Sequence, residues 1–206
     1  FINKIDTQCY LWLRVMSLIQ NKTFEFVIYK ENFLSDKECD DLIKTLDTDE
    51  LHDATMVGGY EGSIVNKNVR NTLSTNFIDE NLNIRLEGAI RVANTQYFNY
   101  DIESLSVLRF LKYDIGGNYN WHTDVGRNET SLRKLTAIIQ LSEEKDYEGG
   151  DFEFGITDKE GTGLITGNRT KGCLLVFPSF LSHRVTPITK GKRYSIISWM
   201  EGDTYK

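Results

Sequence analysis

Two separated parts of the chain hold side chains that could bind one metal ion. His122 and Asp124 stand two positions apart in the stretch Tyr-Asn-Trp-His-Thr-Asp, and His183 lies far downstream. Alternate side chains of a β-strand share a face, so we expect His122 and Asp124 to reach one point, with His183 supplied by a strand across a barrel. Two imidazoles and one carboxylate leave half of an octahedral shell open, which suits oxygen activation by non-haem Fe(II). Zinc accepts the same ligands, so the residue types alone do not decide the metal.

Each of these histidines also has a simpler interpretation. His122 could be a strand-end residue beside Trp121, and His183 could be a capping or core histidine. The chain has only three histidines, and two of them stand in this arrangement, which favours the metal site. The third, His52, has no such context, and we expect it to be solvated.

A second group of residues could bind a dicarboxylate close to that metal. Arg193 and Ser195 share a strand face by the same period of two. A guanidinium binds a carboxylate through two parallel hydrogen bonds, and a serine hydroxyl can add a third. This pair suits the distal carboxylate of 2-oxoglutarate, whose keto acid end would chelate iron. Tyr113 could add its hydroxyl, or it could be a packed aromatic; Arg193 could instead lie on a solvated edge beside Lys190 and Lys192.

Composition and charge limit the classes of function. The chain has 206 residues and a formal net charge of −6, so non-specific attraction to nucleic acid is not expected. Cys9, Cys39 and Cys173 match neither a zinc site nor a disulfide framework. Unpaired thiols favour a reducing compartment, so we expect a cytoplasmic protein.

The first residues have a different character from the rest. The apolar stretch 9–19 contains Arg14 and is too short to span a bilayer, so no membrane insertion is expected. We expect residues 1–22 to be an N-terminal extension, with Met16 as a candidate start, and residues 23–206 to form a single domain.

Two helices and then many short strands are expected along the chain. Ser35 and Glu38 form a capping box that opens a helix ending near Leu46. A second helix is expected over 79–98, and residues 52–70 are expected to form a long loop. The predicted strands cover residues 23–29, 104–113, 135–141, 151–154, 163–166, 173–177, 183–187 and 193–199. This order predicts a mainly β fold, a jelly roll with N-terminal helices packed on one sheet.

The same residues, in this order and spacing, carry a family resemblance. The chain resembles the Fe(II)- and 2-oxoglutarate-dependent oxygenases of the prolyl 4-hydroxylase-like group, and within it the PKHD-type hydroxylases of bacteria and phages. The likeness covers roughly residues 105–200. The matching segments are 108–113, 121–124, 133–136, 140–142, 147–151, 172, 177–180, 183–187, 191 and 193–199.

The resemblance implies a fold, cofactors and an activity. The fold is a double-stranded β-helix, and the cofactors are Fe(II), 2-oxoglutarate and O₂, sometimes with ascorbate. It implies metal ligands at His122, Asp124 and His183, a carboxylate anchor at Arg193, and Tyr113 as its helper. The activity is hydroxylation of a protein or peptide residue, with release of succinate and CO₂. Prolyl 4-hydroxylases often anchor the co-substrate with Lys, whereas the arginine here fits the PKHD branch. This difference weakens the expectation that the hydroxylated residue is proline.

Three other functions stay open at this point. Substrate contacts in this fold come from loops, so the substrate could be a free amino acid or another small metabolite. Nucleic-acid demethylases of this fold carry a second Arg six residues beyond the anchor, where this chain has Trp199. A cupin-like binding module without oxygenase activity would usually carry more histidines. We expect the loop at 56–71, with Tyr60, to shape the substrate entrance.

Overall fold

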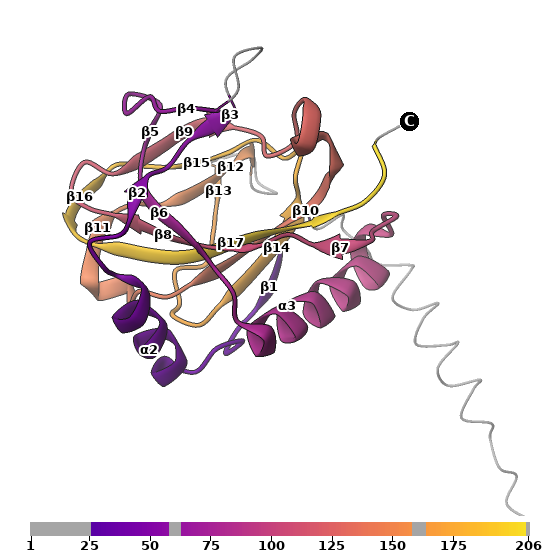
Figure 1. Ribbon diagram of the computed structural model, residues 1–206, viewed down its shortest axis with the longest axis horizontal. Coiled ribbons are helices and arrows are strands. Elements are labelled where there is room, and N and C mark those ends of the chain that lie inside the picture. Colours follow the sequence, from indigo (N-terminus) through magenta and orange to yellow (C-terminus); the bar gives the residue numbers. More distant parts are fainter. Residues whose placement is uncertain (1–25, 58–62, 158–163, 205–206) are drawn as a thin grey trace, which may run out of the picture.

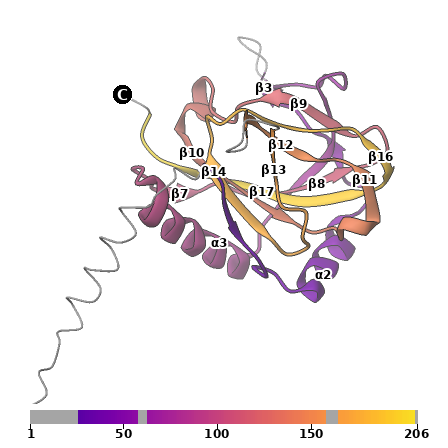
Figure 2. The same cartoon turned by 180° about the vertical axis from the view of Figure 1, so that it is seen from behind.

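The computed structural model describes residues 26–57, 63–157 and 164–204. Two antiparallel sheets face each other, and both α-helices lie against the outer face of the larger one (Figure 1). The reverse view shows the same three layers, with the small sheet and the helices on opposite sides of the large sheet (Figure 2). The expected jelly roll with helices on one sheet is confirmed. The expectations for residues 1–22, Met16, Cys9 and Tyr60 lie outside the described residues.

The large sheet has eight strands, in the order β1-β14-β10-β17-β8-β6-β2 with β7 paired to β17. Along the chain they are β1 (Ile28–Lys30), β2 (His52–Asp53), β6 (Leu73–Phe77), β7 (Ser104–Leu105), β8 (Leu108–Tyr113), β10 (Arg133–Gln140), β14 (Leu174–Pro178) and β17 (Arg193–Glu201). The small sheet has the order β13-β12-β15-β9-β5. Its strands are β5 (Arg70–Asn71), β9 (Asn118–His122), β12 (Phe152–Thr157), β13 (Leu164–Thr166) and β15 (His183–Val185).

Two further strand pairs and three short helical turns complete the described elements. The pairs are β3 (Met56–Val57) with β4 (Ser63–Ile64), and β11 (Tyr147–Gly149) with β16 (Ile188–Gly191). The turns are η1 (Asn94–Phe98), η2 (Asn128–Leu132) and η3 (Glu144–Asp146). Within the described residues, we find no helix long and apolar enough to cross a membrane.

Local sequence signals account for both α-helices. Helix α2 (Asp36–Leu46) begins at Ser35, whose hydroxyl accepts from the Glu38 backbone N–H while the Glu38 carboxylate accepts from the Ser35 backbone N–H. Helix α3 (Glu80–Ala93) is capped by the Asp79 carboxylate. It ends five residues earlier than the expected limit at 98, because the chain continues as a single π-turn, η1.

The large sheet is buried on both faces, and alternation divides its side chains between two cores. Toward the helices, Phe110, Ile139 and Ile196 pack with the apolar stripe of α3. Toward the small sheet, Leu111, Ile138 and Ile197 belong to a second core between the sheets. The stripe of α3 consists of the buried residues Leu82, Leu86, Ile90 and Ala93, as its helical period indicates.

Several strand predictions needed correction. Seven predicted strands of the β-rich part match observed strands to within a few residues, although 104–113 divides into β7 and β8. The predicted strand 23–29 is represented by β1, which begins only at Ile28. The expected loop 52–70 contains short strands, and β6, β11 and β16 were not expected. The strand expected at His122 is β9, which ends before Asp124. Strands of two to five residues with mixed polarity give no periodic signal of their own, and their partners define them.

Leu86 tests the packing of α3 on the sheet. Leu86 is fully buried, whereas Ile84 on the same helix is 74% exposed. We expect Leu86→Ala to lower the free energy of unfolding by about 2–5 kcal/mol, because it leaves a cavity, and Ile84→Ala to change it by less than about 0.5 kcal/mol. Urea unfolding measures both, and equal values for the two variants would contradict this account of the helix.

Candidate active site

The three side chains expected to bind a metal lie together between the two sheets. His122 is the last residue of β9, Asp124 lies in the bend just after it, and His183 is the first residue of β15. Strands β9 and β15 are antiparallel neighbours, and His183 stands directly opposite His122. The expectation that His183 comes from across the barrel is therefore wrong, and so is the placement of Asp124 on the strand.

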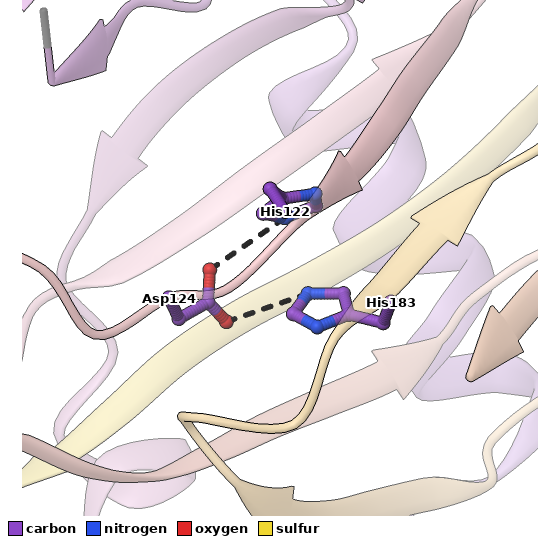
Figure 3. A group of neighbouring side chains, drawn as sticks. All are labelled: His122, Asp124 and His183. Carbon is purple, nitrogen blue, oxygen red and sulfur yellow. Dashed lines mark ion pairs between the residues drawn. The ribbon is translucent and has the colours of Figure 1, made fainter. Parts of the chain in front are cut away.

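The donor atoms of these residues converge on one point (Figure 3). Nε2 of His122 lies 3.7 Å from Oδ1 of Asp124, and Nε2 of His183 lies 3.6 Å from Oδ2 of the same carboxylate. One ligand atom from each of the three residues falls within 4.8 Å of the others. Metal–nitrogen and metal–oxygen bonds are about 2.0–2.2 Å long, so side-chain shifts of under about an ångström would place all three on one ion.

Backbone carbonyls fix the orientation of both imidazoles. Nδ1 of His122 lies 2.7 Å from the carbonyl oxygen of Asn120, and Nδ1 of His183 lies 2.8 Å from that of Leu181. A ring nitrogen that faces a carbonyl oxygen must carry the proton. Nε2 is then left with its lone pair directed at the shared point, which is the state a metal ligand needs.

Asp124 is held as a carboxylate although it is buried. Burial alone would raise its pKa, but His183, His122 and a 2.7 Å hydrogen bond from the Thr136 hydroxyl favour the charged form, and the pKa is lowered overall. The Ser179 hydroxyl lies 3.0 Å from that of Thr136. The Asp124 backbone N–H donates to the Ser179 carbonyl at 2.9 Å, so the bend itself is anchored.

His122 is held in its neutral form. Burial and repulsion from His183 lower the pKa of His122 to about 3, against the attraction of Asp124. Its ring stacks on Tyr119 at a centroid distance of 3.4 Å. The His183 ring lies 5.2 Å from Phe152 and 5.0 Å from Phe177, measured between centroids. Both imidazoles are thus enclosed by aromatic rings, and that of His122 is unprotonated near neutral pH.

The three donors lie in the wall of a cavity of about 910 Å³ that also holds the residues expected to bind a dicarboxylate. Arg193 is only 3% exposed, and its Nη1 lies 3.4 Å from Oγ of Ser195. Tyr113 is directly opposite Arg193 in the β8–β17 ladder, and the guanidinium lies 5.4 Å from its ring centroid. No carboxylate within the described residues lies within 4.0 Å of the Arg193 guanidinium.

The neighbouring lysines and the remaining candidates behave as ordinary surface or core residues. Lys190 pairs with Glu148, and Lys192 pairs with Asp114, both on the outside of the molecule. His52 is exposed, as expected. Cys39 and Cys173 are buried free thiols. Arg193 is therefore not part of the solvated basic edge that its sequence neighbours form.

Sequence reasoning missed three arginines that line the same cavity, Arg70, Arg109 and Arg133. Arg109 carried a usable signal, because it precedes Tyr113 by four residues on one strand and so shares its face. Arg70 lies in the segment expected to be a loop, and Arg133 lies just before the predicted strand 135–141. Nothing local connects these two with the site.

Comparison with known proteins agrees with the geometry of the site. Residues 108–201 match the family model described as the 2OG-Fe(II) oxygenase superfamily. A protein of Synechococcus sp. (strain JA-2-3B'a(2-13)), named as a PKHD-type hydroxylase, is 29% identical over 93 residues. That stretch is 43% of this chain and 40% of the relative, so the chain spans less than half of the relative's length.

Two solved structures share the fold. The crystal structure of a prolyl-4-hydroxylase from Pseudomonas putida superimposes with a TM-score of 0.69, at 19% identity, over 91% of this chain and 98% of that one. The second structure is a prolyl hydroxylase from Trichoplax adhaerens in complex with a peptide fragment of the hypoxia inducible factor oxygen degradation domain. It superimposes with a TM-score of 0.68, at 20% identity, over 97% of this chain and 96% of that one. Over residues 108–201 the chain is therefore similar to the 2OG-Fe(II) oxygenase superfamily, and its fold is that of the solved prolyl hydroxylases.

Proposed function

We propose that this protein is an Fe(II)- and 2-oxoglutarate-dependent dioxygenase that hydroxylates a residue of a protein or peptide and releases succinate and CO₂. One observation carries the proposal. Two imidazole nitrogens and one carboxylate converge in the wall of a cavity that also contains a buried guanidinium without a carboxylate partner within the described residues.

His122, Asp124 and His183 would hold the iron. Their donor set is that of non-haem Fe(II) oxygenases, which leave coordination positions open for co-substrate and O₂. The depressed pKa values of His122 and Asp124 fit this role, because neither ligand has to lose a proton before binding a cation near pH 7. When bound, Fe(II) supplies the oxygen chemistry, and the protein supplies position and a water-poor surrounding.

Arg193 would bind the distal carboxylate of 2-oxoglutarate. The guanidinium is buried, so a carboxylate that it binds through two charge-assisted hydrogen bonds is little screened by water. Ser195 shares its face of β17 and could donate a further bond. The guanidinium lies 5.4 Å from the Tyr113 ring centroid, and Tyr113 also lines the cavity, which supports it as the helper of Arg193.

The proposed substrate is a residue of a peptide or protein. The Trichoplax adhaerens relative of the same fold is described with a peptide bound, which supports a peptide or protein substrate here. A second candidate is a free amino acid or other small metabolite. It is favoured by the size of the cavity, about 910 Å³, which lies in the range typical of small-molecule sites.

Removing a metal ligand tests the iron site. We expect Asp124→Ala and His183→Ala to lose stoichiometric binding of Fe(II), or of Mn(II) as a redox-stable substitute, because two remaining ligands hold a divalent ion far more weakly. Succinate formation from 2-oxoglutarate should fall to background in both. His52→Ala, which changes an exposed histidine, is the control and should keep both properties. Metal binding by the two triad variants at the wild-type affinity would refute the assignment.

Arg193 tests the co-substrate site. We expect Arg193→Met to raise the KM for 2-oxoglutarate by at least about 100-fold, because two charge-assisted bonds of about 1.5–3 kcal/mol each are lost. Metal affinity should be unchanged. The control is Lys192→Met, which removes the same charge one residue away on the outer surface. A KM that rises equally in both variants would show that general electrostatics, and not the anchor, is responsible.

A further inference from the structure

The proposed reaction gives no role to three of the arginines that line the cavity. Five arginines line the cavity, against three acidic residues, although the chain as a whole has a net charge of −6. Arg193 has a role in the proposed function, and Arg127 is exposed. The other three, Arg70, Arg109 and Arg133, form what we call the arginine cluster.

Contacts fix each guanidinium of the cluster beside the metal-binding residues. The Arg133 guanidinium lies 3.6 Å from the ring centroid of Trp199, and its Nη1 lies 3.3 Å from the Asp124 carbonyl oxygen. Arg109 lies 5.5 Å from the same ring. Arg70 stacks on Tyr119 at 4.6 Å, and Tyr119 in turn stacks on His122.

The charges of the cluster are not neutralised by ion pairs. In the described parts of the chain, none of its guanidiniums has a carboxylate within 4.0 Å. Arg70 is 7% exposed and donates from Nη1 to the Thr55 carbonyl, but its Nε is buried without a partner in the described residues, and the same holds for Nε of Arg133. Both side chains therefore hold a charged group whose hydrogen bonds within the described residues are incomplete, and that is costly for a buried group.

The guanidiniums also affect one another. Burial lowers the pKa of Arg109, and repulsion from Arg70 and Arg133 lowers it further, against the attraction of Asp124. Asp124 and Glu201 also line the cavity. These carboxylates lie near the cluster without pairing with it, so positive charge is left over where the cavity adjoins the metal-binding residues.

The cluster and the co-substrate anchor occupy opposite ends of the cavity. Residues 193, 195, 197 and 199 of β17 all line it, as alternate residues of one strand face do. Trp199 is six residues from Arg193, which corresponds to about 20 Å along a strand. On β8, Tyr113 pairs with Arg193, and Arg109 pairs with Ile197 toward the Trp199 end. A five-carbon dicarboxylate bound at Arg193 is too short to reach the cluster as well.

We propose that the substrate presents an anionic group, a carboxylate or a phosphate, to Arg70, Arg109 and Arg133. The proposal rests on the proposed function, because it assigns this end of the cavity to the substrate. Guanidiniums form paired hydrogen bonds with both groups, and two of them lie against the Trp199 ring, at 3.6 Å and 5.5 Å from its centroid. A polyanion that extends over the surface would meet a net negative protein, so an acidic or phosphorylated peptide, and not a nucleic acid, fits the site.

A binding measurement tests this without turnover. The protein is loaded with Mn(II) and saturated with N-oxalylglycine, an inert analogue of 2-oxoglutarate, so that the Arg193 end is filled. Three capped pentapeptides with a central proline are then titrated by calorimetry at fixed ionic strength. One has glutamate at its four flanking positions, one has glutamine, and one has phosphoserine beside the proline. We expect the glutamate or the phosphoserine peptide to bind at least tenfold more tightly than the glutamine peptide. The peptide with the higher affinity shows whether the anionic group is a carboxylate or a phosphate.

Matched variants show where the preference arises. Arg109→Met keeps the apolar stem of a partly exposed side chain, and should weaken binding of the preferred peptide about tenfold, while the affinity for the glutamine peptide and for N-oxalylglycine stays unchanged. Arg91→Met removes the same charge from the outer surface of α3, where Arg91 pairs with Glu87, and should change none of these affinities.

Several outcomes would overturn the proposal. Equal affinity of the wild-type protein for all three peptides would refute anion recognition, as would equal losses in the Arg109 and Arg91 variants. If a single-stranded oligonucleotide bound more tightly than every peptide, the substrate class would be a nucleic acid and not a peptide. Failure of N-oxalylglycine to bind the wild-type protein would count against the proposed function instead, and the peptide comparison can be made without it.

Discussion

The candidate site depends above all on the antiparallel pairing of β9 with β15. That pairing places His183 opposite His122, and the backbone carbonyls of Asn120 and Leu181 then turn both rings so that Nε2 faces the shared point. Register in a sheet is fixed when one face is buried, because a slip by one residue moves every side chain to the other face. The aromatic rings packed around His183 give this register its energetic basis.

The large sheet supplies the other half of the site by the same alternation. Strands β8, β10 and β17 are buried on both faces, yet the two faces differ in chemistry. One face presents apolar side chains to α3, and the other presents Arg193 and Ser195 to the cavity. A sheet that holds polar groups in its interior needs strong support from its apolar face, and the helices provide that support. The stability of α3 packing and the geometry of the cavity are thus linked through the same strands.

Much of the fold could be predicted, and the misses have a common physical origin. Both helices carry local signals, a capping box at Ser35 and an apolar stripe from Leu82 to Ala93, which hold without reference to the rest of the chain. Strands such as β10 and β17 are long and apolar enough to be recognised alone. Strands β5 and β9 are short and polar, and they exist because β5 pairs with β9 and β9 pairs with β15. The prediction that His183 lies across the barrel from His122 was wrong for the same reason, because a local sequence pattern does not indicate which strands pair.

The sequence by itself determined the chemical nature of the candidate site: two histidines, one aspartate and an arginine–serine pair at spacings that suit a metal and a dicarboxylate. Residue type and period are local properties, so they can be read from the chain. Only the tertiary structure decided which charges share one cavity. Arg70, Arg109 and Arg133 come from three strands in two sheets, and each alone resembles an ordinary surface arginine. Their proximity, and the lack of carboxylate partners for them within the described residues, arises from the packing of the two sheets and could not be inferred from any one segment.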